Sequence, residues 1–253
     1  MKRKITAISL VIALVAIAVV GGSLAWFSDT DEATNVFTIG SVEIEQIEQQ
    51  RVVDASGAVT GDLEAFANDK QLIPAIDNTN GTADPNFEDK IVTVKNKGKN
   101  AAWVQTFVAV PKVLNDAGIL HVHTNQGQAG YGWAAPVAVG TVTEDALVTG
   151  GSATLEYTVY KFLYNTTLAA GATTDALMNG VYLDQATDMN VTFAADGVTV
   201  ETAYFVAPDG TEITGFDANG KVNVFVATQA VQADGFASAE VGLDAAFATH
   251  PWA

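Results

Sequence analysis

The chain of 253 residues contains no cysteine, three histidines, and only 12 basic residues against 29 acidic ones. Without cysteine, disulfide bonds, thiol redox chemistry and thiolate-bound metals are excluded. The formal net charge of −17 repels the phosphate backbone of nucleic acids, so we expect no nucleic-acid binding. Because 49% of the residues are hydrophobic and 16% are charged, the chain can still bury a core, which argues against disorder throughout.

Three of the few bases precede a long apolar run at the N-terminus. Residues 2–4 are Lys-Arg-Lys, residues 5–20 carry no charge, and two glycines follow at 21 and 22. This order is typical of a secretory signal peptide. Removing residues 1–25 takes away these three bases and no acid, so the remaining 228 residues carry a net charge of −20.

A cleavage site follows the two glycines. Ser23 and Ala25 place small residues at the −3 and −1 positions of a cut that leaves Trp26 as the new N-terminus. The alternative is an uncleaved membrane anchor, because residues 5–27 are long enough to cross a bilayer. Either way we expect the chain after Ala25 to lie outside the cytoplasm.

The rest of the chain consists of short runs of residues typical of β-strands, separated by turn residues. No strand–helix–strand alternation occurs, so a parallel sheet is not expected. The sequence predicts an all-β fold, an antiparallel two-sheet sandwich of jelly-roll-like form with one or two short helices. One helix is predicted over residues 238–248 with Ser238 as its N-cap. The segments 45–90 and 111–136 are interpreted as coverings of one end of the sandwich. The predicted strands are 90–96, 102–110, 137–142, 153–163, 180–183, 191–194, 198–206 and 221–231.

Catalytic motifs are scarce. His121 and His123 are two residues apart and would share one face of a strand, which makes them weak candidates for metal ligands, although an exposed loop edge is the simpler interpretation. No His-Glu-x-x-His helix and no Gly-x-Ser-x-Gly elbow is present. The aromatic pair around Gly132 is either a loop anchor or, through Trp133, a stacking platform for a glycan. No catalytic residue is therefore assigned.

Acidic clusters leave weak calcium binding open. They occur at residues 29–32, 77–84 and 88–89, and none has the spacing of a calcium-binding loop. A solvated acidic face is the simpler interpretation, and no cofactor is predicted.

The segment behind the cleavage site begins with Trp26 and Phe27. An exposed aromatic pair forfeits about 25 cal/mol for each Å² that it leaves unburied. We expect both rings to find a groove, either in their own sandwich or in a neighbouring molecule by addition of a β-strand.

Two runs near the N-terminus are similar to the TasA/camelysin family of exported proteins. They are Gly21-Gly22-Ser23-Leu24-Ala25-Trp26-Phe27-Ser28-Asp29 and Asn35-Val36-Phe37-Thr38-Ile39-Gly40-Ser41-Val42-Glu43-Ile44. The run from Asp89 to Asn96 with Gly98 and Trp103, and the run from Ala227 to Phe236, resemble later parts of that family.

The resemblance implies a subunit that polymerises into fibres of a bacterial biofilm matrix or cell surface. It implies three parts: a signal peptide (1–25) cut by a SipW-type signal peptidase, a donor strand (26–36) that inserts into the next subunit, and a jelly-roll-like body (37–253). The donor strand would consist of Trp26, Phe27, Ser28, Asp29, Thr30, Asp31, Glu32, Ala33, Thr34 and Asn35. The first strand of the body would include Phe37, Ile39, Gly40, Val42 and Ile44.

The implied partners are further copies of the chain in a filament and a matrix accessory or anchoring protein. Two alternatives stay open: a surface metalloprotease of camelysin type, which would need His121 and His123, and a monomeric sandwich that binds a surface or glycan.

Overall fold

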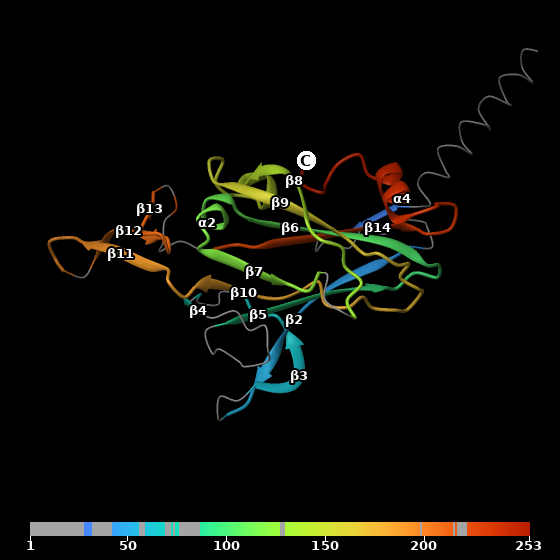
Figure 1. Cartoon of the computed structure of the whole chain (residues 1–253), viewed down its shortest axis with the longest axis horizontal. Coiled ribbons are helices and arrows are strands. Elements are labelled where there is room, and N and C mark those ends of the chain that lie inside the picture. The colour runs from blue at the N-terminus through green and yellow to red at the C-terminus, as the bar shows by residue number, and fades with distance from the viewer. Residues whose placement is uncertain are drawn as a thin grey trace, which may run out of the picture.

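Figure 1 shows the computed structural model of the chain. It describes residues 28–31, 42–55, 59–68, 72, 74–75, 87–126, 130–197, 199–214, 216 and 222–253. These residues form two large, mainly antiparallel sheets and a small third sheet, which confirms the predicted all-β sandwich.

The first sheet has the order β1–β14–β6–β9–β8 and is antiparallel throughout. Its strands are β1 (Ser28–Asp31), β14 (Phe225–Gln232), β6 (Ala102–Pro111), β9 (Glu156–Leu163) and β8 (Val137–Thr143).

The second sheet has the order β3–β2–β5–β10–β4, and β7 also pairs with β10. Only the short β10–β4 pair is parallel. The strands are β2 (Ile44–Val53), β3 (Val59–Ala65), β4 (Pro74–Ala75), β5 (Glu88–Asn96), β7 (Leu120–Thr124) and β10 (Met178–Asp184).

A third sheet continues from the end of β10, with the order β11–β12–β13. Its strands are β11 (Asp188–Phe193), β12 (Val200–Val206) and β13 (Glu212–Ile213), and the described helices are α2 (Lys112–Asp116), α3 (Glu144–Leu147) and α4 (Ala239–Ala246).

The main core lies between the two large sheets. Alternate residues of the central strands point inward, so Val92 and Val94 of β5 share one cluster with Val104 and Val108 of β6. The outer face of the first sheet is covered too, because Leu243 of α4 is buried with Val231 and the C-terminal Trp252 packs against the cluster of Phe107 and Tyr157. Burial on both faces explains why apolar residues occupy the successive positions Phe107 to Val110 of β6.

All eight predicted strands are confirmed, as β5, β6, β8, β9, β10, β11, β12 and β14. The predicted helix is confirmed as α4, where the Ser238 side chain accepts a hydrogen bond from the N–H of Val241. The interpretation of segments 45–90 and 111–136 as coverings is wrong, because they contain β2, β3 and β7. The polar residues that suggested a covering line an inward face of β2 instead.

The sandwich has two ends that differ in structure. At one, which we call the turn end, the β5–β6 turn (residues 97–101) lies against the start of β2, since the N–H groups of Lys97 and Gly98 both donate to the carbonyl of Glu43. The opposite end is called the hairpin end. Figure 1 shows the β11–β13 sheet projecting to the left of the sandwich there, and the β2–β3 hairpin projecting below it in a different direction.

Candidate functional site

The N-terminal strand β1 forms one edge of the first sheet. It pairs antiparallel with β14, with Ser28 opposite Val231 and Asp31 opposite Thr228. The other side of β14 is fully paired with the long strand β6. Of the predicted donor strand, the described residues Ser28, Asp29, Thr30 and Asp31 thus lie at the edge of their own sandwich.

The inner side of this edge is polar. The hydroxyls of Thr228 and Thr106 lie 3.0 Å apart, and both residues are fully buried. Gln46 of β2 reaches across from the second sheet, because its Oε1 accepts from the Thr228 hydroxyl at 2.9 Å and its Nε2 donates to the carbonyl of Val226 at 3.2 Å. This side chain therefore ties the two sheets together beside β1.

The polar contacts continue along β2. Gln46 Nε2 donates to Oε1 of Glu48 at 3.0 Å, and Glu48 pairs with the buried ammonium of Lys90. That ammonium also lies 4.4 Å from the ring centre of Phe66. Thr106, Thr228, Gln46, Glu48 and Lys90 form a chain of contacts across both sheets, which we call the polar seam.

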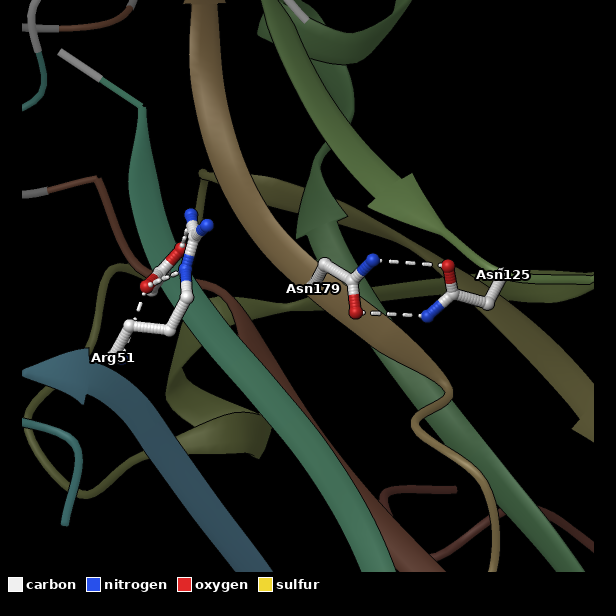
Figure 2. Close-up of polar contacts among 4 residues, drawn as sticks. Arg51, Asn125 and Asn179 are labelled. Carbon is white, nitrogen blue, oxygen red and sulfur yellow. Dashed lines mark hydrogen bonds and ion pairs between the residues drawn. The ribbon is translucent and has the colours of Figure 1, made fainter. Parts of the chain in front are cut away.

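A second charged contact holds the other face of β2. Arg51 makes a bidentate pair with Asp89, with Nε and Nη2 at 2.7 and 2.6 Å from the two carboxylate oxygens (Figure 2). The hydrogen bonds that Arg51 donates to the Asp89 carboxylate raise the pKa of Arg51 above its ordinary value. One of the acidic clusters considered for calcium thus has a carboxylate that is already bound by a guanidinium.

Sequence reasoning missed the polar seam. The signal was limited to the polar run from Glu45 to Arg51, interrupted only by Ile47, in which Gln46 and Glu48 lie opposite Val94 and Val92 of β5. Such a pattern looks like a solvent-facing strand, and only the position of β14 shows that Gln46 lies between sheets.

The two candidate metal ligands lie on β7. His121 is stacked on Tyr182, with ring centres 5.0 Å apart, and Tyr182 is stacked on Phe87, which meets His123 edge-on. The shared aromatic contacts confirm that both imidazoles lie on one face, whereas the interpretation as an exposed loop edge is wrong because His123 is only 8% exposed. The physical reason is the antiparallel pairing of β7 with β10, which places His121 opposite Tyr182 and His123 opposite Gly180.

One carboxylate approaches this pair of histidines. Nε2 of His121 lies 3.4 Å from Oδ2 of Asp184. Throughout the part of the chain that the structure describes, no three His, Cys, Asp or Glu side chains are placed to hold a metal ion together. The described geometry therefore offers two imidazoles in an aromatic stack and does not complete a metal centre.

The loop that contains Trp133 is anchored in the protein interior. Trp133 is 1% exposed, its indole N–H donates to the carbonyl of Asp175 at 2.9 Å, and its ring meets Tyr164 edge-on. A Cβ on Gly132 would lie 2.5 Å from the Tyr164 ring, so this position requires glycine. The stacking platform through Trp133 is therefore wrong, because the indole face is inside the protein.

The family-like run at the end of β5 has a structural explanation. Asn96 is fully buried, its amide donates to the carbonyls of Asn100 and Leu168, and its oxygen accepts from the N–H of Gly98. Asn125 and Asn179 make a comparable reciprocal amide pair between β7 and β10, at 2.9 and 3.0 Å (Figure 2). These amides hold turns and strand register, which is a structural role.

Several predicted residues lie outside the described residues. They include the cleavage residues Ser23, Ala25 and Trp26, the donor-strand residues Phe27, Glu32, Ala33, Thr34 and Asn35, and the body residues Phe37, Ile39 and Gly40. Of the predicted first body strand, Val42 and Ile44 are described and buried, and β2 begins at Ile44.

Comparison with known proteins gives one match. Residues 1–96 match the model of the family described as camelysin metallo-endopeptidase, which confirms the resemblance over this part of the chain. Neither the curated proteins nor the solved structures gave a match. Among the described residues, no helix is long and apolar enough to cross a membrane.

Proposed function

From the match of residues 1–96 to the camelysin family model, we propose that this chain is an extracellular structural subunit that polymerises into cell-surface or biofilm-matrix fibres. Each subunit would insert its N-terminal strand, freed by signal-peptide cleavage, into the next. The observation that carries the proposal is the position of β1 as a terminal strand held along one side by β14.

The place of β1 supports exchange between molecules. A strand at a chain end is removed without disturbing any connection in the sandwich, and the β14 edge of another copy offers it the same backbone hydrogen bonds. The exchange therefore keeps the number of hydrogen bonds unchanged. Since the contact joins two different surfaces, it does not close and produces a filament.

The length of the linker between β1 and the body also supports the proposed strand exchange. Residues 32–41 separate β1 from Val42, and their extended length of at most about 36 Å is enough to reach a neighbouring body. A precursor that keeps its signal peptide would hold β1 near the membrane, so cleavage would act as the switch for assembly.

Electron microscopy of two mature proteins tests the proposal. Protein beginning at Trp26 is expected to form filaments, and protein lacking residues 26–31 is expected to remain monomeric with the same thermal unfolding of the body. Filaments from the shortened protein would rule out strand insertion, and monomers from both would rule out the fibre function.

The family description favours a metallo-endopeptidase as a second candidate. This activity would need His121, His123 and further ligands from outside the described residues. Casein cleavage that a chelator abolishes and that is lost in His121→Ala would support it.

A further inference from the structure

The direction of β1 fixes where a donated strand leaves the sandwich. Ser28 lies opposite Val231, close to the turn end, where the N–H of Ala233 donates to the carbonyl of Ala101. Asp31 lies opposite Thr228, whose side chain is bonded to Gln46 of β2. From Gln46, β2 runs on to Val53 at the hairpin end. A strand in this position therefore runs from the turn end toward the hairpin end.

The same chain enters its own body at the opposite end. β2 begins at Ile44 beside Asn96, at the turn end, and residues 32–41 connect it to β1. In a filament built by strand insertion, on which this inference rests, the donated strand leaves the acceptor at its hairpin end. The linker then brings the turn end of the donating body against that hairpin end.

The hairpin end exposes apolar side chains on both of its projections. Five large ones are between 37% and 57% exposed: Val53, Val59, Leu63, Met189 and Phe193. Three come from the β2–β3 hairpin and two from the edge strand β11. Large apolar side chains that stay exposed on projecting elements are available for burial by a partner.

The projections are also acidic. Asp54, Asp62 and Glu64 lie on or beside the β2–β3 hairpin, and no Lys or Arg occurs from residue 162 to residue 220, a stretch that includes the whole β11–β13 sheet. That sheet carries Asp188, Glu201 and Glu212. Among the described residues, the basic side chains near this end are Arg51, Lys90 and Lys112. They are paired with Asp89, Glu48 and Asp116, so acidic side chains dominate the charge of the two projections.

One part of the turn end, the β5–β6 turn, is positively charged. Lys95, Lys97 and Lys99 lie within five residues at the end of β5 and in the β5–β6 turn. Lys97 and Lys99 are exposed, and the ammonium of Lys97 is 3.9 Å from carboxylates of both Glu43 and Glu45. Ion pairs of this length between exposed groups are weak, so these lysines can take new acidic partners.

We infer that the hairpin end of one subunit is a docking surface for the turn end of the subunit that donates its strand to it. The lysines of the β5–β6 turn meet the acidic β2–β3 hairpin and β11–β13 sheet, and the exposed apolar side chains fill the contact. This body-to-body interface sets the orientation of successive subunits, which a connection of ten residues, with an extended length of at most about 36 Å, does not fix by its length alone.

A charge-swap series in mature protein beginning at Trp26 tests the interface. Asp62→Lys/Glu201→Lys makes the protein four units less negative, so bulk repulsion alone would speed assembly. The interface predicts the reverse, an elongation rate about tenfold lower at low ionic strength, because lysines then face lysines. Lys97→Glu/Lys99→Glu should slow elongation similarly, and the combination of all four changes, with the original net charge, should restore it.

Elongation followed by light scattering and electron microscopy separates the outcomes. Faster or unchanged elongation of Asp62→Lys/Glu201→Lys, or no rescue in the fourfold variant, would overturn the interface while leaving strand insertion intact. Absence of filaments from the unmodified protein would instead count against the proposed function. Thermal unfolding of each variant checks that these exposed positions leave the fold unchanged.

Discussion

At the residue scale, polar side chains inside the sandwich distinguish this protein from a simple apolar β-fold. A buried ammonium such as that of Lys90 is tolerated because Glu48 and the Phe66 ring compensate for lost hydration. Gln46 satisfies groups of both sheets at once, and its loss would leave the Thr228 hydroxyl and the Val226 carbonyl without this partner. These residues stabilise the edge where β1 lies.

His250 predicts an acid sensitivity. Burial lowers its pKa below the ordinary value, its Nδ1 is buried without a hydrogen-bond partner, and its ring packs near Phe107 and Trp252. The unfolded chain, with a histidine pKa of about 6.5, therefore takes up a proton more readily than the folded chain. Stability is expected to fall as the pH drops below that value.

Urea unfolding at pH 7 and pH 5 measures this effect. We expect His250→Gln to lose less stability than the unmodified protein over that interval, since glutamine does not titrate. An equal loss in the two proteins would show that His250 does not contribute.

At the scale of elements, β1 differs from every other strand of the first sheet in length and attachment. It spans four residues, whereas β6 and β14 span ten and eight. A short edge strand contributes few hydrogen bonds, so its removal is compatible with a folded sandwich. The other edge strand, β8, is interrupted by a register shift between Ala138 and Gly140, which opposes strand addition.

Proline substitutions in β1 give a paired test of strand insertion. Successive N–H groups of a strand point to opposite sides, so only one of Asp29 and Thr30 donates toward β14. Asp29→Pro and Thr30→Pro are expected to differ: one blocks filament formation, and the other, whose N–H faces away, permits it. Filament yield by electron microscopy measures the difference, and two variants that assemble equally well would contradict the pairing.

At the scale of the whole molecule, charge opposes association. The chain after residue 25 carries a net charge of −20, and subunits this acidic repel one another at low ionic strength. A directional contact must overcome this repulsion.

Assembly is therefore expected to respond to ions and protons. Filament yield, measured by sedimentation, should rise with added salt or calcium, which screen or bridge carboxylates, and with mild acidification, which neutralises them. A yield that stays constant across ionic strength and pH would contradict this prediction.

The sequence by itself determined the class of fold and most strands. Alternating runs such as residues 90–96 and turn signals between them are local, so strand positions follow from a few adjacent residues. The N-cap of α4 was likewise local, because Ser238 bonds a residue three positions away. The resemblance to the camelysin family also rested on contiguous residues.

Only the tertiary structure decided which side chains meet. The pairing of β1 with β14 joins residues about two hundred positions apart, and the bond between Gln46 and Thr228 spans a similar distance. The burial of Trp133 and His123, and the opposite placement of the lysine turn and the acidic projections, depend equally on strand order. Local periodicity cannot encode such contacts, because they form only when the two sheets close around a shared core.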